Sequence, residues 1–180
     1  GVKAGMWPLH SWLTTAHPIA VSPASAVLSG VIVKAGVIGV IRAIFYLVGA
    51  DFVKGTWVQY TWLILILLTI LMGSTLAYFE KELKKRLAYS TISQVSYILF
   101  GLAMFNETAY EGALMQFLAH AFAKCALFMI AGVFIMLTGS KTVESLRGIG
   151  KKYPVLLWMF TICSLSMVGI PPTGGFLAKW

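Results

Sequence analysis

Residues 57–79 read WVQYTWLILILLTILMGSTLAYF and contain no charged side chain. A helix rises about 1.5 Å per residue, so a stretch of this length crosses a hydrocarbon core of about 30 Å with slight tilt. The stretch therefore predicts a membrane-spanning helix, and the rest of the chain is interpreted outward from it.

The composition of the whole chain also indicates a membrane protein. Of its 180 residues, 59% are hydrophobic and 11% are charged, and the mean hydropathy is +0.85. A soluble domain usually contains about 25% charged residues. The composition therefore excludes a water-soluble enzyme, a disordered tail and a conventional nucleic-acid binder, and we expect no nucleic-acid partner.

Further apolar stretches lie on both sides of 57–79, at 22–50, 87–105, 109–137 and 154–170. Residues 1–7 resemble the tail of a preceding helix, and residues 176–180 resemble the beginning of another. We therefore predict an all-α, polytopic membrane protein. Residues 1–180 are expected to form a single transmembrane domain that is a fragment of a longer fold, with broken helices near both ends.

The basic residues predict how the chain is oriented. Loop 80–86 and loop 139–153 each contain four lysine or arginine residues, whereas the connections 51–56 and 106–108 contain only Lys54. Because cytoplasmic loops carry the excess of basic residues, we place the two rich loops in the cytoplasm. The predicted location is the inner cell membrane, which the chain crosses several times, and this topology accounts for most of the net charge of +8.

Two lysines lie inside the predicted spans. Lys34 is near the middle of 22–50 and Lys124 is near the middle of 109–137. Ionisable residues within a membrane usually face a wet interior and mark ion or proton routes. Since His120 precedes Lys124 by four residues, and Gln116 precedes His120 by four, these three side chains share one helix face. The alternative is a structural lysine that caps the carbonyls of a broken helix or extends to an interface.

Small polar residues are candidates to line a water-filled path beside these lysines. They are Ser29, Ser90, Gln94, Tyr97 and Gln116. Hydrogen bonding between helices is an equally good interpretation of them. The only cysteines, Cys125 and Cys163, suggest neither a metal site nor a disulfide framework.

Lysines also accompany the predicted helix breaks. Lys3 precedes Trp7-Pro8, and Lys179 follows the run PPTGG at 171–175. Discontinuous helices with charged residues at the break are a recurring device of ion transporters.

Several runs of this sequence resemble the signatures of one family, the antiporter-like subunits shared by respiratory complex I, Mrp-type sodium/proton antiporters and membrane-bound group 4 hydrogenases. These runs are KAGMWPLHSWL (3–13) with AHP (16–18), PASAVLSG (23–30) continuing through KAG (34–36) to Arg42, KRLAYSTISQ (85–94), HAFAK (120–124) and GGFLAK (174–179). The resemblance implies a fold of about fourteen helices with inverted repeats, of which this chain covers the seventh helix to the start of the twelfth.

The same resemblance implies a role for individual residues. Lys3 and Lys179 would be the lysines of the two broken helices, and Lys34 the central lysine of the eighth helix. His120 and Lys124 would form the connecting relay on the eleventh helix. Lys85 matches a basic position at the start of the tenth. Gln116 stands where some members have a second histidine, so the relay is expected to be shorter or filled by water.

The sequence thus predicts proton translocation, with sodium exchange as an open alternative, within a multi-subunit redox-driven or Mrp-type complex. We expect Lys3, Lys34, Lys85, His120, Lys124 and Lys179 to carry the protons. The expected partners are other membrane subunits and the lipid bilayer, and no cofactor or metal is expected in this chain. One alternative is a membrane subunit that transports nothing. Another is an oxidoreductase subunit that binds quinone or haem, although no cysteine cluster or suitable histidine pair supports it.

Overall fold

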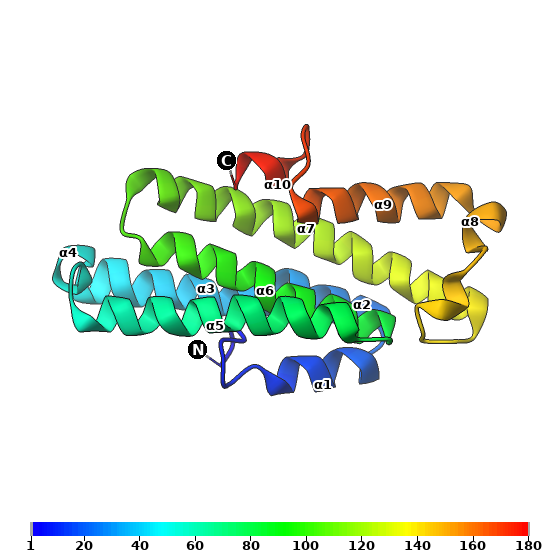
Figure 1. Ribbon diagram of the computed structural model, residues 1–180, viewed down its shortest axis with the longest axis horizontal. Helices are drawn as coiled ribbons and strands as arrows, with labels where there is room; N and C mark the ends of the chain where they lie inside the picture. Colours follow the sequence, from blue (N-terminus) through cyan, green and yellow to red (C-terminus); the bar gives the residue numbers. More distant parts are fainter. Residues whose placement is uncertain (1, 180) are drawn as a thin grey trace.

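The computed structural model describes residues 2–179, which form an all-α bundle whose long helices lie side by side (Figure 1). The long helices are α3 (Val33–Ile41) with the segments that continue it, α5 (Trp57–Phe79), α6 (Leu83–Ala103), α7 (Glu107–Thr138) and α9 (Pro154–Val168). Helix α1 (Ser11–Ile19) lies along one side of the bundle, and α9 with α10 (Gly174–Leu177) lies along the opposite side. The short helices α4 (Ala50–Val53), α8 (Ile149–Lys152) and a 3-10 turn (Glu144–Leu146) belong to the connections.

The predicted span 22–50 is a continuous helix from Ser22 to Val48 that changes type along its length. It consists of α2 (Ser22–Val27), a π-helical segment (Leu28–Ile32), α3 and a second π-helical segment (Arg42–Val48). Pro23 lies in the first turn, where its missing N–H removes no helical hydrogen bond. Segments of π-helix are rare and often lie at functional sites. The first segment contains Ser29, and Lys34 follows it on the second residue of α3.

Helix α6 lies at the centre of the packing, between α5 and α7 and against α1 and α3. Its apolar side chains contribute to both core clusters. The first cluster includes Leu13, Val33, Ile66, Ile92, Ile98 and Leu102. The second includes Leu83, Leu87, Leu127, Phe128 and Phe134. Polar side chains on α6 are thereby held against helices on several sides.

The outer surface of the bundle is apolar. Among the described residues, three helices are long and apolar enough to cross a membrane: Ser22–Val48, Trp57–Phe79 and Glu107–Thr138. Large side chains such as Leu71, Phe122 and Met136 are exposed on them, and α9 buries none of its residues. Such a surface suits lipid or other membrane subunits rather than water.

The structure differs from the sequence expectation at the first broken region and shows the expected break at the second. Residues 2–10 form turns, and α1 begins only at Ser11, so no helical tail occupies the described residues of 1–7. At the other end, α9 ends before Gly169, whose φ of +90° an L side chain rarely adopts. One helical turn, α10, begins at Gly174. Gly1 and Trp180 lie outside the described residues.

The two basic loops are joined at one end of the bundle. Glu82 and Thr142 form an antiparallel β-bridge. Around it, the Leu83 N–H donates to the Lys141 carbonyl at 2.9 Å, and the Val143 N–H donates to the Lys81 carbonyl at 3.0 Å. The loops 80–82 and 141–143 therefore lie on the same side of the bundle.

Candidate functional site

The two central lysines are buried among helices. Lys34 on α3 is 2% exposed, and Lys124 on α7 is fully buried. Neither has a carboxylate partner, because the one ion pair recorded among residues 2–179 joins Lys85 to Glu80. Burying an unpaired charge is costly, so both amino groups depend on neutral hydrogen-bond acceptors.

Lys34 is held by the π-helical segment that precedes it. Its Nζ donates to the Ser29 carbonyl. The Ser29 hydroxyl is buried and lies 2.9 Å from the hydroxyl of Thr91 on α6. A polar contact therefore leads from the Lys34 site to the central helix.

Lys124 is held by the turn of α6 that contains Thr91. Its Nζ donates to the Leu87 carbonyl at 2.8 Å and to the Ser90 hydroxyl. The Thr91 hydroxyl donates to the same Leu87 carbonyl at 2.9 Å. Lys34 thus bonds to the carbonyl of Ser29, whose hydroxyl contacts Thr91, and Thr91 shares the Leu87 carbonyl with Lys124 as a common acceptor.

A cavity of about 350 Å³ lies beside Lys124. It is lined by Leu87, Ser90, Gln94, Tyr97, Lys124, Leu127, Ser164, Met167, Val168 and Lys179. Three of the residues expected to line a water path, Ser90, Gln94 and Tyr97, are among them. The cavity has room for several water molecules, and it brings Lys124 and Lys179 to one space.

Lys179 reaches the end of the broken helix. Its Nζ donates to the carbonyls of Met167 at 2.8 Å and Val168 at 3.3 Å, in the last turn of α9. It also lies 5.4 Å from the centre of the Tyr97 ring. The carbonyl end of a helix attracts cations, so this geometry fits both interpretations of Lys179, as a carbonyl cap and as a charge facing the cavity.

His120 and Gln116 lie on the Lys124 face of α7, and both are buried. The Gln116 amide donates to Gln94 Oε1 at 2.7 Å, which connects it to the cavity wall. Gln116 Oε1 and both ring nitrogens of His120 have no recorded hydrogen-bond partner among the described residues. Unpaired buried polar atoms are uncommon, but the buried ring of His17 shares this feature. What sets His120 apart is its place one helical turn from Lys124.

Lys3 has an exposed side chain, but its backbone crosses the helix that carries Lys34. A Cβ at Gly36 would lie 2.7 Å from the Ala4 nitrogen and 2.8 Å from the Lys3 carbonyl carbon. The absence of a side chain at Gly36 therefore lets the Lys3 turn approach α3 two residues beyond Lys34.

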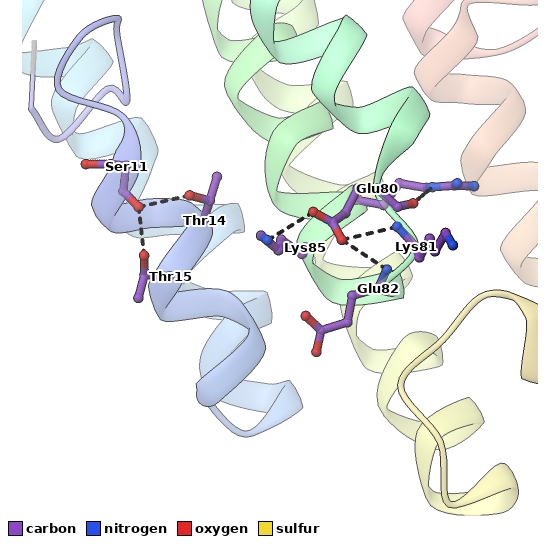
Figure 2. Close-up of polar contacts among 8 residues, drawn as sticks. Ser11, Thr14, Thr15, Glu80, Lys81, Glu82 and Lys85 are labelled. Atoms are coloured by element: carbon purple, nitrogen blue, oxygen red, sulfur yellow. Dashed lines mark hydrogen bonds and ion pairs between the residues drawn. The ribbon is translucent and has the colours of Figure 1, made fainter.

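Lys85 lies outside this buried group, at the end of the bundle (Figure 2). Its Nζ is 3.1 Å from Glu80 Oε2. Partial burial opposes ionisation of Glu80, but hydrogen bonds from Lys85 and from the Glu82 and Lys81 N–H groups outweigh it and lower the pKa of the Glu80 carboxyl. The hydrogen bond with Glu80 in turn raises the pKa of Lys85.

Lys84, next to Lys85 in the sequence, is buried. The Lys84 Nζ donates to the Ala20 carbonyl at 2.9 Å, just past the end of α1. Sequence reasoning missed both Lys84 and Thr91. Lys84 could be distinguished from Lys85 only by its contact with another helix. Thr91 stood outside the face defined by Ser90, Gln94 and Tyr97, although a helical threonine that bonds back to residue i−4 is a known pattern.

Metal-binding groups do not assemble in the part of the chain that the structure describes. Within residues 2–179, no three histidine, cysteine, aspartate or glutamate side chains lie together in a group that could hold a metal ion. Cys125 and Cys163 are free thiols.

His17 is buried and stacks on Phe128 with 4.5 Å between ring centres. Phe128 belongs to the second core cluster, so this is a packing contact.

Sequence comparison gives a match along the whole chain. The family described as "NADH:quinone oxidoreductase/Mrp antiporter, TM" matches residues 1–180. The chain is 38% identical to NADH-quinone oxidoreductase subunit N of Desulforudis audaxviator, over 100% of this chain and 36% of that protein. It is 36% identical to hydrogenase-4 component B of Escherichia coli, over 100% of this chain and 28% of that protein.

Solved structures agree with the sequence comparison. A chain of the Mrp complex from Dietzia sp. superposes with a TM-score of 0.88 at 29% identity, covering 99% of this chain and 33% of that one. A chain of the membrane-bound sulfane sulfur reductase, an archaeal respiratory membrane complex, superposes with a TM-score of 0.87 at 26% identity, covering 99% and 36%. The chain thus spans about a third of the length of the relatives it matches, and its resemblance to an antiporter-like subunit is confirmed.

Proposed function

The chain belongs to the NADH:quinone oxidoreductase/Mrp antiporter transmembrane family, and from this premise we propose that it carries protons across the membrane as part of a multi-subunit complex. The route that we propose includes Lys34, Lys124 and Lys179, with His120 beside Lys124. The observation that supports it most strongly is that the two buried lysines, neither of which has a carboxylate partner, bond to neighbouring polar groups that meet at Thr91.

The chemistry of these residues suits a transient charge. A lysine held only by carbonyl and hydroxyl oxygens is stabilised as an ammonium ion while it donates, and it can become neutral because no fixed carboxylate requires its charge. The cavity offers room for water between Lys124 and Lys179. Moving one charge against 100 mV costs about 2.3 kcal/mol, so each step requires only a modest change in electrostatic bias.

Lys3 and Lys85 have different places in the proposal. The Lys3 turn packs on α3 beside the Lys34 site, so Lys3 is proposed as the residue that exchanges protons with Lys34. Lys85 is left out of the route, because its ion pair with Glu80 lies away from the buried lysines. The loops 80–86 and 139–153 are proposed to face the cytoplasm, and the driving reaction is supplied by the partner subunits or by sodium exchange.

Replacing Lys34 with Ala tests the proposal. In inverted vesicles that contain the assembled complex, energised by its own driving reaction, we expect proton uptake measured by dye quenching to fall about tenfold or more. Lys54→Ala, in an exposed connection, is the matched control and should be normal. Normal uptake in the Lys34 variant would instead favour a membrane subunit that transports nothing.

A further inference from the structure

The carbonyl of Leu87 accepts more donors than its lone pairs can serve. Lys124 Nζ lies 2.8 Å from it, and the hydroxyls of Ser90 and Thr91 each lie 2.9 Å from it. A carbonyl oxygen has two lone pairs, so three good hydrogen bonds cannot be at full strength together. The three donors therefore compete for one acceptor.

Thr91 has an alternative partner, so the competition for the Leu87 carbonyl affects a second contact. Its hydroxyl is 2.9 Å from the Ser29 hydroxyl, and either oxygen can be the donor. That contact is the one recorded hydrogen bond within residues 2–179 by which Ser29 or Lys34 reaches another helix. Both hydroxyls are fully buried, so neither can replace a lost partner with bulk water.

We propose that Thr91 is a positioning residue that couples the Lys34 site to the Lys124 site through the shared Leu87 carbonyl. When Lys124 donates fully to Leu87, the Thr91 hydroxyl turns toward Ser29. When Lys124 turns into the cavity that it lines, Thr91 donates to Leu87 and accepts from Ser29. The carbonyl that holds Lys34 belongs to Ser29 itself, in the π-helical segment, so the two hydroxyls connect the Lys124 site to the residue that holds Lys34.

The inference rests on the proposed function, and Thr91→Val tests it because valine keeps the shape and removes the hydroxyl. We expect about a tenfold loss of proton translocation, the rate equivalent of one buried hydrogen bond, with normal content of assembled complex in the membrane. Thr91→Ser keeps the hydroxyl and should translocate protons at the rate of the parent protein. Ser96→Ala is the matched control, since Ser96 is buried on the same helix and its one recorded side-chain hydrogen bond among residues 2–179 is to the Ile92 carbonyl, at 2.9 Å.

A double-variant comparison separates coupling from a general packing defect. If Thr91 acts through Lys124, Thr91→Val should cause little further loss in a Lys124→Ala background, whereas independent effects would multiply. Normal translocation in Thr91→Val, with Lys124→Ala impaired, overturns this inference and leaves the proposed function standing. Equal losses in Thr91→Val and Ser96→Ala also overturn it.

Ser29→Ala provides a second approach, because it removes the opposite end of the same hydrogen bond. Should Thr91→Val fail to assemble, Ser29→Ala decides the matter. A loss similar to the expected tenfold supports the coupling, and a normal rate refutes it. Normal translocation in both Lys34→Ala and Lys124→Ala would instead contradict the proposed function itself.

Discussion

At the scale of residues, the site depends on buried lysines that are held without carboxylates. Lys34 and Lys124 each donate to a backbone carbonyl, and Lys124 also donates to Ser90. Replacing either lysine with a neutral side chain leaves no buried negative charge behind, so folding should tolerate the change better than it tolerates loss of one partner from a buried ion pair. Effects on transport and on assembly can therefore be separated.

For Lys124, we expect both Ala and Arg variants to lose proton translocation while the complex still assembles. Alanine cannot hold a proton, and arginine cannot release one, since the guanidinium stays protonated. Lys141→Ala, in an exposed part of loop 139–153, is the control. Dye quenching in vesicles measures transport, and blotting of the membranes measures assembly. Full translocation in the alanine variant would falsify the relay role.

Lys179→Arg distinguishes the two interpretations of Lys179. Arginine can still donate to the carbonyls of Met167 and Val168, so a carbonyl cap would be preserved and the complex should remain stable. If Lys179 exchanges protons with the cavity, translocation should fall about tenfold or more. A variant that is stable and transports normally shows that Lys179 only caps α9.

The Glu80–Lys85 pair is expected to affect stability slightly and transport not at all. Because the pKa of Glu80 is lowered, the pair stabilises the fold above the ordinary carboxyl pKa and loses this contribution as the pH falls through the lowered value. Because the pKa of Lys85 is raised, the contribution is also lost as alkaline pH passes that raised value. The pair is partly exposed, and surface ion pairs are worth about 0.2–1 kcal/mol.

Thermal unfolding of the purified protein with Lys85→Ala should therefore show a small loss at neutral pH that disappears in acid. Proton translocation in vesicles should be unchanged. A large loss of translocation with normal stability would return Lys85 to the route.

At the scale of elements, the Lys3 turn crosses closely over α3. Substitutions at two glycines of that helix test whether this crossing matters. Gly36→Ala would place a Cβ within 3 Å of the Ala4 and Lys3 backbone, which cannot move as a side chain can. We expect a destabilisation of about 1–3 kcal/mol and a displaced Lys3. Thermal unfolding measures the first effect, and proton uptake measures the second.

Gly39→Ala is the matched control for this crossing. It lies on the same helix, and nothing lies within 4 Å of the position that its Cβ would occupy. Because alanine favours helices over glycine by about 1 kcal/mol, this variant should be as stable as the parent or more so. Equal effects at both positions would show that the crossing does not matter.

How far the sequence predicts these elements depends on what determines each one. The uncharged run 57–79 coincides with α5 because its composition alone requires burial in an apolar medium. No local pattern marks the π-helical segment Leu28–Ile32, which depends on how residues 22–48 pack. The same limit applies at Thr91 and Lys84, whose partners Ser29 and Ala20 lie in other segments of the chain.

At the scale of the whole molecule, the bundle makes a definite prediction about topology. Loops 80–82 and 141–143 are joined, while Asn106 lies in the connection at the other end of α6 and α7. Single cysteines at Lys81 and Lys151, both exposed, should react with an impermeant thiol reagent from the cytoplasmic side. A cysteine at Asn106 should react from the opposite side.

The background for that experiment lacks Cys125 and Cys163, the two native thiols. Because the β-bridge joins the two loops, the cysteine at Lys81 and the one at Lys151 must react from the same side. If that shared side is the external one, the orientation inferred from the basic loops is reversed.

The β-bridge between Glu82 and Thr142 also has a consequence for biogenesis. Its two partners are separated in the sequence by both α6 and α7, so it can close only after the ribosome has delivered both helices and the second has returned to the starting side. Until then, the Lys81 carbonyl and the Leu83 N–H lack the partners that the second loop gives them. The bridge therefore closes late, and its protection from hydrogen exchange in nascent chains would mark the moment when this helical hairpin is fully inserted.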